Sequence, residues 1–169
     1  MLMSSTSVLY AVPAADYLNE VAKVVKANGK SNIIYVSTNR PADNITKVLK
    51  GYGAETENIF FIDCASHKAC TQYDGTGKCI CLESPSDIMG ISIALTEASA
   101  SSEGSKIVLL DSVSTMLIYN SEEVICKFFN FMINKMRVND VSSVLFVLST
   151  DMEKTAIKTI EMFVDEVKK

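Results

Sequence analysis

The feature that most constrains this chain is a repeated alternation between short apolar runs and longer runs whose apolar residues recur at helical spacing. The short runs are rich in β-branched and aromatic residues, which favour strands. Two consecutive strands of a parallel sheet need a crossover between them, usually a helix. The alternation therefore predicts an α/β fold with a mostly parallel sheet and helices on both of its faces. The predicted strands span residues 6–12, 32–37, 58–63, 107–111 and 144–148.

Proline and capping residues mark where the predicted helices begin. Pro13 and Pro41 each follow a strand, and proline suits a first helical turn because its missing N–H is not needed there. Ser84 precedes a proline and begins a third helix, while a fourth begins after Asn120 with the spacing of a capping box. Thr150 and Glu153 are expected to cap the last helix. Five helices between and after the strands complete the repeated βαβ pattern.

The predicted helix after Asn120 has an unusually wide apolar surface. One apolar stripe suffices to pack an amphipathic helix on a sheet. A second stripe is available for contact with another subunit or domain, so we expect a protein partner or a homo-oligomer. The two sides consist of Val124, Phe128 and Phe131, and of Ile125, Phe129, Met132 and Met136.

Length and charge exclude several classes of protein. The 169 residues fit a single domain, 1–169, with a variable Cys-rich loop at residues 64–84. The net charge of -4 argues against a nucleic-acid binder driven by bulk charge. No run approaches the roughly 20 apolar residues of a membrane span, and the first residues lack the pattern of a secretion signal. We therefore expect a cytoplasmic protein, in which cysteines are more often thiols or metal ligands than disulfides.

The fourth predicted strand, residues 107–111, has four consecutive apolar residues before Asp111, and Ser112 follows it. This segment resembles the Walker B strand of the RecA and KaiC-like ATPases, whose Asp helps to hold the magnesium of a bound nucleotide. The resemblance implies a RecA-like three-layer α/β/α sandwich with P-loop NTPase topology, five strands in the order 3-2-4-5-1 along the chain, and assembly into rings. Further segments resemble the family in the same order, at residues 34–37, 59–63, 117–120 and 162–167.

Two departures from this family bear on catalysis. Its phosphate loop, G-x-x-x-x-G-K-[ST], would fall near residues 12–20, but this segment contains no glycine and no lysine, and it carries Asp16 and Glu20, which would repel a triphosphate. KaiC-like ATPases also tend to have catalytic glutamates after the second strand, where residues 37–40 contain no carboxylate to activate a water. The chain thus resembles a degenerate, non-hydrolysing relative of the archaeal KaiC-like group, and bound ATP and magnesium are not expected.

Two pairs of residues at the ends of strands are candidate binding residues. Asp111 and Ser112 are either a remnant of a Walker B site or a hydrogen-bonded end of the strand. Asn39 and Arg40 follow the second strand, at the sheet edge where open α/β folds bind ligands. Arg40 either binds an anion there or is a solvated residue at the start of a helix.

A loop rich in cysteine offers possible metal ligands. Zinc is bound by four thiolate or imidazole donors in a tetrahedron, and residues 79–82 suit a short extra strand with two cysteines on one face. The spacing matches no standard zinc finger, so a redox-active pair and ordinary thiols are alternatives. The candidate ligands are Cys64, His67, Cys70, Cys79 and Cys81.

These observations favour a non-catalytic domain that regulates or scaffolds through protein contacts. One alternative is a nucleotide-binding ATPase whose degenerate site is completed by a partner. Another is a metal- or redox-sensing module that uses the Cys/His loop. For the first reading no cofactor is expected, and zinc belongs only to the last.

Overall fold

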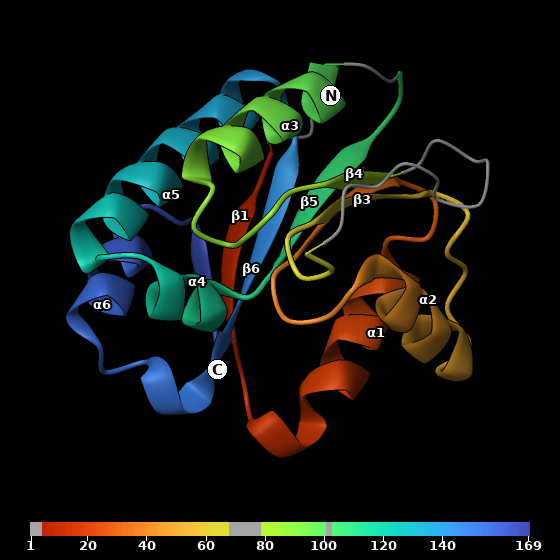
Figure 1. The fold of residues 1–169 in the computed structure, drawn as a ribbon, viewed down its shortest axis with the longest axis horizontal. Coiled ribbons are helices and arrows are strands. Elements are labelled where there is room, and N and C mark those ends of the chain that lie inside the picture. Colours follow the sequence, from red (N-terminus) through yellow and green to blue (C-terminus); the bar gives the residue numbers. More distant parts are fainter. Residues whose placement is uncertain (1–4, 68–78, 101–102) are drawn as a thin grey trace.

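The computed structural model describes residues 5–67, 79–100 and 103–169 of the chain. Its centre is a seven-stranded sheet in which every pair of neighbouring strands is parallel (Figure 1). The predicted α/β fold with a parallel sheet is therefore confirmed. The strands are β1 (Ser7–Val12), β2 (Asn32–Ser37), β3 (Ile59–Asp63), β4 (Cys79–Cys81), β5 (Lys106–Asp111), β6 (Ser142–Leu148) and β7 (Glu166–Lys168).

The sheet differs from the predicted one in its number of strands and hence in its order. The observed order is β4-β3-β2-β5-β6-β1-β7, rather than five strands in the order 3-2-4-5-1. The two additional strands, β4 and β7, lie at the two edges, outside β3 and β1, and each contains three residues. A three-residue strand at an edge is too short to give a clear alternating pattern. The sequence analysis therefore indicated only that residues 79–82 suit a short strand, and it did not predict β7.

Helices cover both faces of the sheet and complete three layers (Figure 1). On one face lie α1 (Tyr17–Ala27) and α2 (Ala42–Gly51). On the other lie α3 (Ile88–Ala100), α5 (Glu122–Val138) and the two shorter helices α4 (Val113–Tyr119) and α6 (Thr155–Glu161). Among residues 5–67, 79–100 and 103–169, no helix is long and apolar enough to cross a membrane.

Strand β5 explains why the core has two halves. Val108 and Leu110 belong to the apolar cluster beneath α3 and α5, whereas Ile107 and Leu109 belong to the cluster beneath α1 and α2. Successive side chains of a strand point to opposite faces, so a central strand covered on both sides must be apolar at every position. The continuous apolar run before Asp111 reflects this central place in the sheet.

Helix α5 buries all of one predicted apolar side and part of the other. Ile125, Phe129, Met132 and Met136 are buried as predicted for one side of the helix. On the other predicted side, Phe128 is buried too, because α3 packs beside α5. Val124 and Phe131 remain exposed.

Candidate functional site

A cleft of about 920 Å³ opens at the carboxyl edge of the sheet. Its walls come from the chain segments that follow β1, β2, β5 and β6, which lie next to one another at this edge. Open α/β sheets bind ligands in such crevices, beyond the carboxyl ends of their strands. The lining includes Tyr17, Asn39, Arg40, Asn44, Asp111, Ser112, Thr115, Ile118, Asp151 and Lys154.

Asp111 is the last residue of β5, and only 2% of its surface is exposed. Both of its carboxylate oxygens accept hydrogen bonds from phenols. The Tyr17 hydroxyl donates to Oδ1 at 2.5 Å, and the Tyr35 hydroxyl donates to Oδ2 at 2.6 Å. Of the two alternatives left open for Asp111, these contacts are the kind expected for a residue that orients the end of a strand by hydrogen bonding.

Burial dominates the electrostatics of this cluster. It raises the pKa of Asp111 above its ordinary value, because a charged carboxylate is poorly solvated there, although the two phenols and the charge of Arg40 act in the opposite direction. Burial and the neighbouring Asp111 charge also raise the pKa of the Tyr17 and Tyr35 hydroxyls. Both phenols therefore stay protonated and act as donors at neutral pH.

Tyr17 comes from the segment in which a phosphate loop would be expected. After β1, Pro13 leads into one turn of 3-10 helix at Ala14–Asp16, and Tyr17 is the first residue of α1. Its ring packs edge-on against Phe146 of β6, with ring centres 6.2 Å apart. The turn after β1 thus supplies a phenol to Asp111.

Ser112 and Thr38 join the ends of β5 and β2. The Asp111–Ser112 peptide is cis. Its carbonyl at Asp111 accepts hydrogen bonds from the Thr38 N–H and hydroxyl, both at 2.8 Å, and the Ser112 N–H donates to Thr38 Oγ1 at 2.9 Å. Ser112 Oγ accepts from the Thr115 N–H and so caps α4, a helix that the sequence analysis did not predict.

Asn39 and Arg40 reach the same cleft, as their place after β2 suggested. Asn39 accepts a hydrogen bond from the Thr115 hydroxyl and lies 3.4 Å from Ser112 Oγ through its amide nitrogen. Arg40 is exposed and donates to Asn44 Oδ1 at 3.3 Å. Within the described part of the chain, no carboxylate lies within ion-pair distance of Arg40.

Sequence reasoning missed the two tyrosines and the basic residue on the far wall. A tyrosine inside an otherwise apolar central strand needs a partner for its hydroxyl, so Tyr35 carried a usable signal. Tyr17 gave none, because its helical spacing also fits a core residue. Lys154, which is paired with Asp151 at 2.9 Å, follows a short turn after β6 whose direction the pattern does not specify.

Of the candidate metal ligands in the described part of the chain, the structure does not bring Cys64 and His67 together with Cys79 and Cys81. Ligand atoms of Asp63, Cys79 and Cys81 lie within 4.8 Å of one another, but Cys64 and His67 are outside this group. Asp63 is already occupied as an acceptor for the N–H groups of Ala42, Ala65 and Ser66. Cys70 lies outside the described residues.

The sulfur chemistry of this loop also differs from the expectation. Cys81 is disulfide-bonded, so the preference for thiols or metal ligands over disulfides is wrong for this residue. Burial, with the charge of Asp63, raises the pKa of the Cys64 and Cys79 thiols to about 12. His67 Nδ1 is hydrogen-bonded to the Glu83 carbonyl at 2.8 Å. The Cys64 and Cys79 thiols are therefore protonated at neutral pH in the metal-free protein.

Three solved structures from Pyrococcus horikoshii are similar in fold. An uncharacterized protein, PH0321, in complex with an unknown peptide, is 11% identical, with a TM-score of 0.67 over 97% of this chain and 76% of that chain. The KaiC-like protein PH0186 is 12% identical, with a TM-score of 0.61 over 96% of this chain and 69% of that one. The protein PH0250 is 11% identical, with a TM-score of 0.60 over 99% and 82%. At such identities the likeness concerns the fold, which is similar to that of KaiC-like domains.

The comparison with curated proteins gave no match. A protein-family model matches residues 9–167, which include all four segments that line the cleft. This family is described as one of unknown function, DUF7504. Since the match extends over nearly the whole chain, the protein belongs to the DUF7504 family.

Proposed function

We propose that this protein is a non-catalytic, degenerate KaiC-like domain that acts through contacts with other proteins. The observation that carries the proposal is the state of Asp111, whose two carboxylate oxygens are taken by Tyr17 and Tyr35. In the Walker B strands that this segment resembles, the corresponding carboxylate helps to hold the magnesium of a bound nucleotide. Here it holds the turn after β1 against the centre of the sheet.

The residues around Asp111 support a structural role for it. Burial raises the pKa of Asp111, whereas a carboxylate that binds magnesium must be charged and open to the ion's waters. The turn from Pro13 to Asp16 contains no glycine at which the backbone could approach a phosphate closely, and it adds a negative charge. Thr38, Asn39 and Arg40 after β2 provide no general base for an attacking water.

A role in protein contacts also agrees with the fold comparison. PH0321, whose fold is similar, was solved in complex with an unknown peptide. A fold that has lost phosphoryl-transfer residues still offers a rigid sheet with helical faces for binding. We therefore assign the function of this domain to binding, with the partner either another protein or a second copy of the chain.

Calorimetric titration with ATP and magnesium tests the non-catalytic part of the proposal. We expect no binding heat and no release of phosphate, because Asp111 is unavailable and no phosphate loop is present. Binding with a dissociation constant of about 10 µM or tighter that disappears in Asp111→Asn would overturn the proposal. Lys47→Gln, on the exposed side of α2, serves as the matched control because it lies outside the cleft.

A second candidate function is supported by the cleft itself. Its volume of about 920 Å³ accommodates a small ligand, and Arg40 contributes positive charge to its walls, whereas Lys154 is paired with Asp151. A nucleotide whose phosphates meet Arg40 and a residue from a partner would fit the alternative of a partner-completed site. The same titration distinguishes the two, since this candidate requires binding that is weakened by Arg40→Gln.

A further inference from the structure

The outer face of α5 carries an apolar stripe that nothing in the described structure covers. Val124, Phe131 and Val138 are 41%, 52% and 80% exposed. Each follows the previous one by seven residues, which is close to two helical turns and about 10 Å along the axis. The three side chains therefore lie along one line of the helix. This seven-residue repeat corresponds to one of the two apolar positions per heptad along which helices pack.

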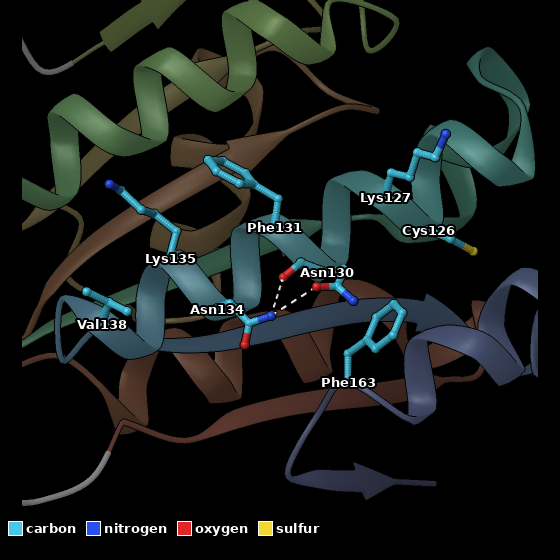
Figure 2. A pocket seen from close by; sticks show the side chains of 8 residues that line it. All are labelled: Cys126, Lys127, Asn130, Phe131, Asn134, Lys135, Val138 and Phe163. Atoms are coloured by element: carbon cyan, nitrogen blue, oxygen red, sulfur yellow. Dashed lines mark hydrogen bonds between the residues drawn. The ribbon is translucent and has the colours of Figure 1, made fainter.

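Positive charge brackets the middle of this stripe. Lys127 and Lys135 lie four residues before and four residues after Phe131, on adjacent turns (Figure 2). They belong to a shallow depression of about 740 Å³ whose lining contains no acidic residue. The chain as a whole has a net charge of -4, so this surface is opposite in sign to the rest of the molecule. Its lining consists of Cys126, Lys127, Asn130, Phe131, Asn134, Lys135, Val138 and Phe163.

The asparagines of this surface hydrogen-bond to each other and not to the exposed Lys127 or the half-buried Lys135. Asn134 Nδ2 donates to the Asn130 carbonyl and to its Oδ1, both at 3.0 Å (Figure 2), and Asn134 Oδ1 accepts from Arg137 at 3.3 Å. Lys127 pairs with Glu123 at 2.6 Å, but both side chains are 76% exposed, and such surface pairs are easily exchanged. In the part of the chain described by the structure, Lys135 has no carboxylate within ion-pair distance.

We propose that the α5 surface formed by Val124, Lys127, Phe131, Lys135 and Val138 binds an acidic amphipathic helix of a partner protein. This inference rests on the proposed function and names the chemistry of the partner. A helix whose own apolar residues recur at three- and four-residue spacing can pack its apolar face along this repeat. Glu or Asp residues four positions to either side of the partner's central apolar residue would form ion pairs with the two lysines.

A second copy of this chain complements the charge of the α5 surface less well than an acidic helix does. Two α5 helices packed around Phe131 in antiparallel orientation would bring Lys127 of one copy against Lys135 of the other. In parallel orientation, each lysine would face its own counterpart. Like charges facing each other oppose association, whereas opposite charges steer the encounter.

An unbiased selection tests the proposal. A displayed library of random peptides of about 16 residues, roughly 24 Å when helical, is selected on the immobilised full chain. We expect the enriched peptides to be acidic, to have apolar residues at helical spacing, and to gain helical circular dichroism on binding. Enriched peptides that are basic or neutral, or no enrichment above background, would overturn the proposal.

Matched variants then locate the binding site of the enriched peptides. Phe131→Gln, and separately Lys127→Gln with Lys135→Gln, should each weaken binding by at least about tenfold. The controls are Tyr52→Gln, an exposed aromatic residue directly after α2, and Lys30→Gln with Lys47→Gln, two exposed lysines outside α5. These controls should leave binding unchanged. If Phe131→Gln does not fold, the lysine pair decides the question.

The outcomes separate this inference from the proposed function. Acidic peptides that bind equally well to the α5 variants would contradict the α5 site while leaving a protein-contact function intact. Self-association that Phe131→Gln abolishes, without peptide enrichment, would replace the acidic helix by a second copy. Nucleotide binding at Asp111 would overturn the non-catalytic assignment without affecting peptide binding at α5.

Discussion

The carboxyl edge of the sheet and the outer face of α5 both contain candidate binding residues predicted from the sequence. In the structure, the key residue of the first is buried and hydrogen-bonded, whereas those of the second are exposed. At the sheet edge, Asp111 is buried and both of its oxygens have donors within the molecule. On α5, Phe131, Val138 and Lys127 are exposed, and Lys135 is half-buried. The comparison teaches that polar residues at a position resembling an active site can be fully used by the fold. Residues on an ordinary helix can meanwhile be left without an internal role.

The largest effect that tests this contrast is expected at Asp111. In Asp111→Ala, the hydroxyls of Tyr17 and Tyr35 lose their acceptor in a buried place, which costs about 1–3 kcal/mol for each. We expect a loss of about 3–5 kcal/mol in the free energy of unfolding, measured by urea denaturation. A loss below about 1 kcal/mol would mean that Asp111 is not a structural residue.

The two tyrosines should differ in the same assay. Tyr35 is fully buried, so in Tyr35→Phe the Oδ2 oxygen of Asp111 loses its donor with no access to water. We expect this substitution to cost about 2 kcal/mol and Tyr17→Phe, at the rim of the cleft, about 1 kcal/mol. The reverse order would indicate that the turn after β1, rather than the centre of the sheet, depends most on Asp111.

The pH dependence of stability should have opposite signs in the two regions. Burial raises the pKa of Asp111, so its folded state binds a proton more readily than its unfolded state. Its stabilising effect is therefore complete below the ordinary carboxyl pKa of about 4 and is lost as the pH rises through the raised value. The free energy of unfolding of the wild type, minus that of Asp111→Asn, should fall from about pH 3 to pH 7.

Glu123 on α5 provides the matched comparison for this titration. A hydrogen bond from Lys127 lowers its pKa, so its stabilising effect is present above the ordinary carboxyl value and is lost as the pH falls. The difference between wild type and Glu123→Gln should thus change with pH in the opposite direction and by less, since both side chains are exposed. Equal slopes for the two differences would contradict the contrast between the regions.

The smallest effect is expected at the end of the exposed stripe. Val138 is 80% exposed, so Val138→Ala removes little buried surface and improves helix propensity. The free energy of unfolding should change by less than about 0.5 kcal/mol in the same denaturation assay. A larger loss would mean that Val138 packs within the fold and is unavailable to a partner.

The sequence predicted the parallel sheet because its central strands are short, apolar and separated by amphipathic runs. Strand β5 is the clearest example, since its place between two covered faces requires an apolar residue at each position from Ile107 to Leu110. It could not predict β4 and β7 with the same clarity, because strands of three residues carry little periodic signal. The order of strands in an edge-extended sheet follows from contacts that local patterns do not encode.

The candidate site was predictable in its location but not in its chemistry. Parallel strands end at a common edge of the sheet, where open α/β folds bind ligands. The residues that follow β2 and β5 therefore line one cleft, and they are Asn39, Arg40, Asp111 and Ser112. The role of Tyr17 depends on how the turn after Pro13 directs the first residue of α1, which is a matter of three-dimensional geometry. The cysteines illustrate the converse, since their sequence proximity does not unite Cys64 and His67 with Cys79.

The short edge strands have a consequence for solubility. An exposed sheet edge presents unpaired N–H and C=O groups that can template pairing with another chain, and short or charged edge strands limit this hazard. Here the six-residue β1, which is mostly apolar, lies one position inside β7, whose Glu166 and Lys168 are exposed. Strand β7 is held there by Asp165, which accepts from the Ser7 N–H at 2.8 Å and pairs with Arg137 at 3.0 Å. A few charged residues at the rim thus shield an aggregation-prone strand from its neighbours in concentrated solution.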